Sequence, residues 1–198
     1  MWLAVFFGAS VLVALTPGAN NLLGMHHAVH HGPARAVTAL FGRLGAFAVM
    51  VAAVVAGLGP VLAASHLALT VLKWAGVAYL AYLAVRVLTT RRGGEVPVGK
   101  GSPLRKEFLV AISNPKAVLI FTAFVPQFVD PARGPIPLQL AVLGAVYLVA
   151  ELLAGSAYAA LGAGIRRAGL TRRARAWLDR ATGAVLLGMA GALAVSKP

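Results

Sequence analysis

Two similar stretches of this sequence are Leu12-Val13-Ala14-Leu15-Thr16-Pro17 and Val110-Ala111-Ile112-Ser113-Asn114-Pro115, which lie 98 residues apart, counted from Pro17 to Pro115. Each stretch belongs to a long apolar run and ends on a proline. Proline donates no backbone hydrogen bond and crowds the preceding helical turn, so it bends or breaks a helix. The match at a fixed offset predicts two related halves, each with a helix that is interrupted at the same point.

Six apolar runs follow one another along the chain. The sequence has 198 residues, of which 60% are hydrophobic and only 12% charged, and this composition excludes a soluble globular domain. A helix needs about 20 mainly apolar residues to span a bilayer. The runs are residues 2–25, 36–59, 67–88, 108–129, 138–165 and 181–196. We therefore predict an all-α membrane protein with six transmembrane helices, of which the first and fourth are broken at Pro17 and Pro115.

The two halves have opposite orientations in this interpretation, because three crossings separate corresponding helices. We expect a single domain over residues 1–198, with one repeat at about 1–92, a second at about 104–198 and a basic cytoplasmic loop at 89–107. Inverted repeats of this kind occur in many secondary transporters. In those proteins, interrupted helices at corresponding positions mark the substrate site.

The positive charge of the chain is concentrated in two loops. The sequence has 18 Lys and Arg residues, 5 Asp and Glu residues and a net charge of +13. The loop cations are Arg86, Arg91, Arg92, Lys100, Arg105 and Lys106, and then Arg166, Arg167, Arg172, Arg173, Arg175 and Arg180. Because Lys and Arg accumulate in cytoplasmic loops, both loops are predicted to be cytoplasmic and both termini external. The charge indicates topology and contact with anionic membrane lipid, and we expect no nucleic-acid partner.

Polar side chains lie beside both prolines at membrane depth. Asn20 and Asn21 follow the first interruption, and Asn114 and Lys116 flank the second. Polar groups are costly in lipid, so we expect these side chains to face a shared cavity. Asparagine can bind both an ammonium and a carboxylate group, and Lys116 can hold a carboxylate, so the set suits a zwitterion. In a structural alternative, the asparagines bind backbone groups freed by the prolines, and Lys116 snorkels or pairs with an acid. This structural role and the role in substrate binding can coexist.

The predicted substrate site has one more potential component, because Glu151, in the fifth run, is the only acid that we expect inside a span. Glu151 is a candidate proton carrier, a ligand for an ammonium group, or a fixed counter-ion of Arg43, and we assign Glu151 and Arg43 as candidates for ion coupling. The candidate substrate-binding residues are Pro17, Gly18, Asn20, Asn21, Asn114, Pro115 and Lys116.

Four histidines near the cytoplasmic end of the first run form two pairs with helical i, i+4 spacing. They are His26, His27, His30 and His31. Such pairs can bind Zn²⁺ or Ni²⁺, but no carboxylate or thiolate lies close in sequence to complete a site, and the chain has no cysteine. We expect side chains that face the membrane interface, and we assign no metal and no cofactor.

Four stretches resemble the LysE and RhtB family of amino acid exporters. They are Leu15-Thr16-Pro17-Gly18-Ala19-Asn20-Asn21-Leu22-Leu23, Leu72-Lys73-Trp74-Ala75-Gly76-Val77-Ala78-Tyr79-Leu80, Asn114-Pro115-Lys116-Ala117 and Pro126-Gln127-Phe128-Val129-Asp130-Pro131. The resemblance implies a translocator of about six spans in the bacterial inner membrane. It also implies export of amino acids or related small metabolites by antiport with protons, and frequent homodimers.

Three other function classes remain as alternatives to this expectation, and the first is a purely structural membrane subunit, which tightly packed helices without a cavity would favour. A divalent-metal or other small-cation exporter of the same superfamily would need acidic or thiolate ligands along its path. A membrane-embedded enzyme would need a nucleophile with its base, or a metal motif such as H-E-x-x-H, and the sequence contains none. We therefore expect a transporter of a small-molecule substrate and no enzyme.

Overall fold

The computed structural model describes residues 1–57, 102–169 and 172–195, together with isolated residues between 70 and 88. The described part of the chain is helical and contains no strand, which confirms the all-α class. Its helices are α1 (Trp2–Leu15), α2 (Ala19–His31), α3 (Pro33–Val55), α6 (Pro103–Ile112), α7 (Pro115–Leu119), η1 (Ile120–Phe124), η2 (Val125–Phe128), η3 (Pro131–Arg133), α8 (Ile136–Arg167) and α9 (Arg172–Val195). The predicted span at 67–88, the family-like stretch at 72–80 and loop residues 89–101 fall mostly outside the described residues.

The first interruption separates α1 from α2. The helix α1 ends at Leu15, α2 begins at Ala19, and the two axes differ by 63°. Thr16 has ψ 125°, the extended conformation that a residue before proline prefers, and Gly18 is also extended. Pro17 therefore lies where the chain leaves one helix and enters the next.

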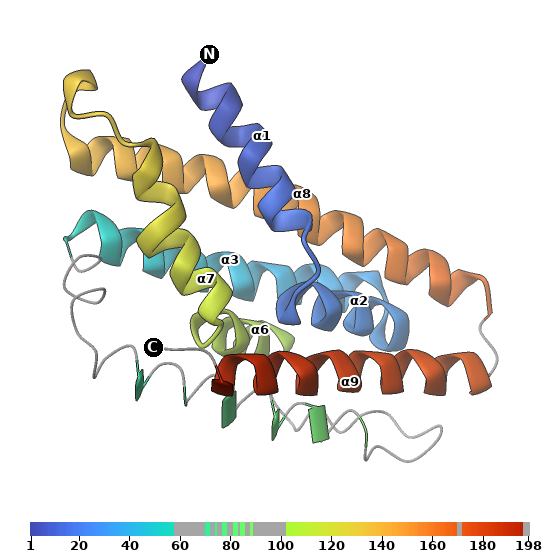
Figure 1. The fold of residues 1–198 in the computed structure, drawn as a ribbon. Coiled ribbons are helices and arrows are strands. Elements are labelled where there is room, and N and C mark those ends of the chain that lie inside the picture. The colour runs from blue at the N-terminus through green and yellow to red at the C-terminus, as the bar shows by residue number, and fades with distance from the viewer. Residues whose placement is uncertain are drawn as a thin grey trace.

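The second interruption separates α6 from α7. The helix α6 ends at Ile112, α7 begins with Pro115 in its first turn, and the segments on either side differ by 60°. Asn114 precedes the proline in an extended conformation, and its side chain accepts a hydrogen bond from the backbone N–H of Lys116 at 3.0 Å. Both interruptions lie in the middle of the molecule (Figure 1).

Helix boundaries differ from the predicted runs at two places. The helix α6 begins at Pro103 and not at 108, so part of the predicted basic loop at 89–107 is helical. The helix α9 begins at Arg172 and not at 181, and the last basic cluster therefore extends into its first turns. Proline can occupy the first turn of a helix, whose N–H groups have no partner within the helix, and this explains the early start of α6.

Two helices of the described chain, α3 and α8, are long and apolar enough to cross a membrane. If each bent pair counts as one span, the described residues provide up to four candidate spans. Large apolar side chains are exposed on the outside of these helices, among them Val5, Leu12, Phe41, Leu153 and Leu161. An apolar exterior of this extent is unfavourable in water and is suited to a lipid environment.

The helix α8 packs antiparallel along α3 at two glycines. A Cβ on Gly144 would collide with Val51, and a Cβ on Gly155 would collide with Leu40. Residue numbers therefore increase along α8 while those of the contacted residues on α3 decrease, which shows that the two helices run in opposite directions. Small residues permit this close approach between helices in membranes. The same principle applies to α3 and α6, because a Cβ on Gly42 would collide with the backbone of Leu104.

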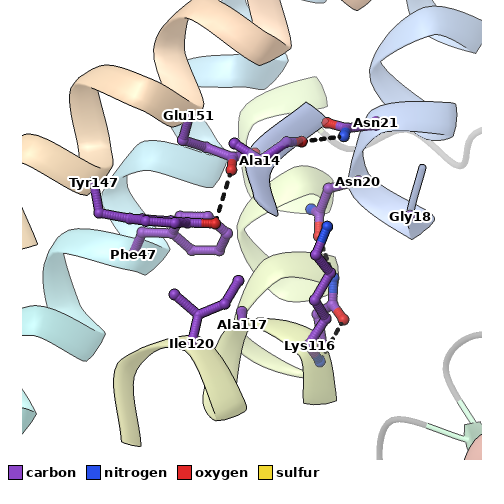
Figure 2. A pocket seen from close by; sticks show the side chains of 11 residues that line it. Ala14, Gly18, Asn20, Asn21, Phe47, Lys116, Ala117, Ile120, Tyr147 and Glu151 are labelled. Carbon is purple, nitrogen blue, oxygen red and sulfur yellow. Dashed lines mark hydrogen bonds between the residues drawn. The ribbon is translucent and has the colours of Figure 1, made fainter. Parts of the chain in front are cut away.

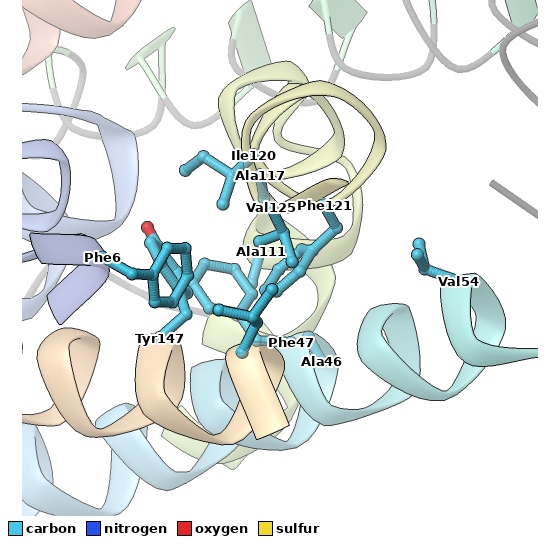
Figure 3. Close-up of a cluster of buried hydrophobic side chains, with 11 residues drawn as sticks. Phe6, Ala46, Phe47, Val54, Ala111, Ala117, Ile120, Phe121, Val125 and Tyr147 are labelled. Carbon is cyan, nitrogen blue, oxygen red and sulfur yellow. The ribbon is translucent and has the colours of Figure 1, made fainter. Parts of the chain in front are cut away.

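Aromatic side chains fill the space between α1, α3, α8 and the segment after α7 (Figure 3). Phe121 lies edge-on to both Phe47 and Tyr147, with ring centroids 5.5 and 5.4 Å apart, and Phe6 lies 4.9 Å from Phe128. Such pairs contribute about 0.5–1.5 kcal/mol each beyond their buried area. Two of these aromatic residues, Phe47 and Tyr147, also line the polar site described below, so the aromatic cluster packs directly against that site.

Candidate functional site

A cavity lies between the two helix interruptions (Figure 2). It contains about 270 Å³ of empty space, part of it open to the surface of the molecule. The room for the centres of water-sized molecules inside it is only about 20 Å³, enough for about one water, so binding of an amino acid requires the cavity to open considerably. The lining residues are Ala14, Gly18, Asn20, Asn21, Phe47, Asn114, Lys116, Ala117, Ile120, Tyr147 and Glu151.

The structure brings most of the predicted site residues together around this cavity. Gly18, Asn20, Asn21, Asn114 and Lys116 line it, and Glu151 lies in its wall. Pro17 is exposed and outside the lining, and only the backbone placement of Pro115, at the start of α7, is described. Arg43 does not line the cavity but is buried behind it, with 1% of its surface exposed.

Lys116 binds backbone carbonyls at the end of α1. Its Nζ donates to Val13 O at 2.8 Å and to Thr16 O at 3.0 Å. The last carbonyls of a helix have no partner within that helix and carry partial negative charge, so a cation there is stabilising. The structural alternative was that Lys116 pairs with an acid or snorkels. In the structure its two hydrogen bonds go instead to backbone carbonyls at the first interruption.

Two further side chains bind the same helix end. Asn21 Nδ2 donates to Ala14 O at 2.8 Å, and Tyr158 OH donates to Leu15 O at 3.0 Å. The carbonyls that the interruption frees are therefore bound by side chains, as membrane-embedded backbone requires. Asn21 has the structural role considered for the asparagines, and it also lines the cavity.

Asn20 and Asn114 connect the two halves of the chain. Asn114 Nδ2 donates to Asn20 Oδ1 at 2.7 Å, and Asn20 Nδ2 donates to Glu107 Oε2 at 2.8 Å. Asn114 Oδ1 also caps α7 through the N–H of Lys116. Each asparagine thus uses both ends of its amide within a continuous network of buried hydrogen bonds.

Arg43 is the centre of this network. Its Nη1 donates to Glu151 Oε1 at 2.9 Å and to Asn21 Oδ1 at 2.8 Å. Its Nη2 donates to Glu107 Oε1 at 3.1 Å and to the backbone carbonyl of Asn20. A planar guanidinium can reach several acceptors in fixed directions, and here it joins α2, α3, α6 and α8.

Glu107 is a site residue that sequence reasoning missed. The prediction that Glu151 is the only acid within a span is wrong, because Glu107 lies in α6 with no exposed surface and forms an ion pair with Arg43. A helical pattern could have revealed it: Glu107, Val110, Ala111 and Asn114 recur at i, i+3, i+4 and i+7, which is one face of a helix.

Glu151 contacts the cavity from α8. Tyr147 OH donates to Glu151 Oε2 at 3.3 Å, while Glu151 Oε1 pairs with Arg43. Phe47, Tyr147 and Ile120 form an apolar wall beside this carboxylate, and Asn20, Asn21 and Lys116 lie across from it (Figure 2). The cavity therefore offers a carboxylate, an ammonium group and an apolar surface within one small space.

The histidine pairs lie outside the lining of this cavity, and the expectation that they face the membrane interface is wrong for His26 and His27, which are 4% and 1% exposed. The rings of His26 and His30 are 4.3 Å apart, and those of His27 and His31 are 5.8 Å apart. Within the residues that the structure describes, no group of three or more His, Cys, Asp or Glu side chains is placed to hold a metal ion. The cavity itself presents one carboxylate among its lining residues.

A helical membrane protein with a polar cavity between two interrupted helices has the architecture of a small-molecule translocator. Comparison with known proteins agrees with this class. The chain matches the LysE type translocator family over residues 11–197, and it belongs to that family. No solved structure matches it significantly.

Similar proteins include named exporters. An uncharacterized membrane protein of Vibrio cholerae serotype O1 is 29% identical over 100% of this chain and 98% of its own length. A homoserine/homoserine lactone efflux protein of Salmonella typhimurium is 28% identical over 81% of this chain and 80% of its own. A leucine efflux protein of Salmonella choleraesuis is 24% identical over 61% of this chain and 60% of its own.

Proposed function

We propose that this protein is a secondary transporter that exports amino acids or related small metabolites across the bacterial inner membrane, by antiport with protons. The observation that carries the proposal is the cavity between the two interrupted helices, because Asn20, Asn114 and Lys116 from the two halves meet there. Sites at the interface of two related halves suit alternating access, since movement of one half against the other exposes the site to either side.

The proposed topology has six spans in two inverted repeats, with helices 1 and 4 broken at Pro17 and Pro115. The similar bends of 63° and 60° support it. Arg166 Nη1 donates to His30 O at 2.9 Å, so the basic end of α8 lies beside the end of α2, as two cytoplasmic helix ends would. A fluorescent reporter that folds only in the cytoplasm should stay dark when fused after Pro198, and a bright fusion would contradict the topology.

The proposed substrate orientation follows from the charges in the cavity. Lys116 uses two of its three N–H donors on α1, so the third remains to bind a substrate carboxylate. The extended Gly18 precedes α2 without a side-chain cap, and the positive end of that helix also favours a carboxylate. Glu151 can bind the ammonium group of the substrate, and Phe47 and Ile120 can contact the side chain of the substrate. Glu151 and Arg43 are the proposed coupling residues.

The partners in this proposal are a small-molecule substrate, membrane lipid and a second copy of the chain. The basic helix ends are expected to contact anionic lipid headgroups on the cytoplasmic side. Homodimerisation is proposed on the family resemblance alone.

Efflux of radiolabelled amino acids tests the function. Cells that express the protein should release L-homoserine or L-leucine, the compounds named for two relatives, faster than cells that lack it. Equal rates across a panel of amino acids, with metal salts limiting growth only of cells that lack the protein, would contradict the proposal and favour a cation exporter.

A further inference from the structure

One buried cation serves two buried carboxylates in this site. Arg43 pairs with Glu151 at 2.9 Å and with Glu107 at 3.1 Å, and the three side chains are 1%, 6% and 0% exposed. The ammonium of Lys116 is directed to the carbonyls of α1. Lys116 also acts electrostatically on Glu151, whereas Arg43 is the cation that acts on Glu107 and is shared with Glu151. A partly compensated buried charge is unfavourable, so a proton on Glu107 relieves the imbalance.

The two carboxylates differ in what can reach them. Glu151 lines the cavity, where its second oxygen accepts a hydrogen bond from Tyr147. Glu107 is outside the lining and has no exposed surface; its oxygens bind Arg43 and Asn20. A substrate ammonium in the cavity can therefore replace Arg43 at Glu151 but cannot reach Glu107.

We propose that Glu107 carries the proton that is exchanged for substrate, and that Arg43 transmits substrate binding from Glu151 to Glu107. This inference rests on the proposed function. When the substrate ammonium binds Glu151, Arg43 pairs fully with Glu107, whose carboxylic acid O–H bond breaks and releases its proton to water. When the substrate leaves, Arg43 returns to Glu151, and the carboxylate of Glu107 takes up one proton.

Among the described neighbours of Glu107, Arg43 is the group whose movement changes the charge around this carboxylate. From α2 the neighbouring side chain is the neutral amide of Asn20, and a Cβ on Gly24 would lie 3.6 Å from Glu107 Oε1, so little space remains there. Arg43 of α3 and Glu151 of α8 are the charged groups that act on Glu107 itself. The elements around it also carry His26, His27, His30 and His31 of α2, Arg35 of α3, Lys116 of α7, Tyr147, Tyr158, Arg166 and Arg167 of α8, and Arg105 and Lys106 of its own helix.

This arrangement makes proton and substrate binding mutually exclusive, which is the requirement for antiport. One proton leaves for each substrate bound. By linkage, substrate affinity then rises about tenfold per pH unit where Glu107 is protonated in the free protein, and becomes independent of pH above that range.

Calorimetry on the purified full-length protein tests the inference, with L-homoserine and L-leucine as probes. Titrations in two buffers of different ionisation enthalpy count the protons released. The wild type should release about one proton per bound probe, and Glu107→Gln should bind with no release and no pH dependence. In liposomes, Glu107→Gln should exchange labelled for unlabelled probe but lose transport driven by a pH gradient.

Asp130→Asn is the matched control for removing a carboxylate. Arg133 donates to Asp130 at 2.9 Å, and this bond, with one from the N–H of Ala132, lowers the pKa of Asp130, so the residue is charged at neutral pH. Because Asp130 is only partly buried and lies outside the network, this variant should release a proton as the wild type does.

Glu107→Asp covers the possibility that Glu107→Gln does not fold. A role as proton carrier predicts that Glu107→Asp still releases one proton, with the pH midpoint of probe affinity displaced from that of the wild type. An unchanged midpoint would overturn the assignment, because a purely structural carboxylate does not set it.

Two results separate this inference from the proposed function. If Glu107→Gln still releases a proton on binding the probe, the proton does not belong to Glu107; export stands and the inference fails. If the wild type transports no amino acid of the panel, the proposed function fails, and this inference fails with it.

Discussion

The two interruptions differ in where their hydrogen-bonding partners come from. At the first, side chains from distant parts of the chain bind the end of α1. At the second, the residue that directly precedes α7 caps that helix. Lys116 and Tyr158 reach α1 from α7 and α8, while Asn114 caps the helix that it precedes. Asn21 of α2 also binds this helix end, but two of the three side chains that bind it come from the second half, which therefore contributes to the stability of the first interruption. The difference indicates that the second half forms a scaffold on which the first broken helix is held.

Loss of Arg43 should have the largest effect, because it removes the ion pairs that join α3 to both α6 and α8. Arg43→Ala leaves Glu107 and Glu151 buried without their cation, and removal of one partner from a buried ion pair costs about 3–5 kcal/mol. We expect a large loss of folded protein in thermal unfolding of the purified chain. Arg35→Ala, an exposed arginine of the same helix, is the control. Equal losses for the two variants would show that Arg43 does not hold the halves together.

Removal of the Lys116 ammonium should disturb the first interruption more than the second. Lys116→Met frees the carbonyls of Val13 and Thr16 while keeping most of the side-chain volume. Each lost hydrogen bond to a charged group is worth about 1.5–3 kcal/mol, less where water replaces it. We expect reduced stability and at least about tenfold weaker binding of a substrate carboxylate, measured by calorimetry. Unchanged affinity would exclude Lys116 from substrate binding.

Loss of the Asn114 cap should have the smallest effect of the three on stability. Asn114→Ala removes the N-cap of α7 and the link to Asn20, and such caps contribute about 0.5–2 kcal/mol. Ser102→Ala is a matched control, because Ser102 precedes α6 without a side-chain cap hydrogen bond. If Asn114→Ala destabilises the protein as much as Lys116→Met, the two interruptions depend equally on distant contacts, and the comparison is wrong.

The sequence predicted those parts of the site that depend on local chemistry. Proline and polar residues at membrane depth identified five of the cavity-lining residues, namely Gly18, Asn20, Asn21, Asn114 and Lys116, and the pairing of Arg43 with Glu151 was one of the roles considered.

Other parts of the site required the three-dimensional arrangement. The partners of Lys116 lie about 100 residues away in sequence, on a helix end whose position depends on packing. Phe47 and Tyr147 were not predicted to line the cavity, because apolar periodicity does not show which residues of a buried face meet an empty space. Glu107 was assigned to a loop because the adjacent cations, Arg105 and Lys106, dominated the interpretation of that stretch.

The central claim is that substrate passes through the cavity between the two interruptions, and filling that cavity tests it most directly. Ala117 lines the cavity with 1% of its surface exposed, whereas Leu119, two residues further along α7, is 63% exposed. Purified Ala117→Phe and Leu119→Phe proteins in liposomes should differ in the exchange of labelled L-homoserine or L-leucine. We expect Leu119→Phe to exchange at the wild-type rate and folded Ala117→Phe to lose most exchange. Undiminished exchange by Ala117→Phe would contradict the account.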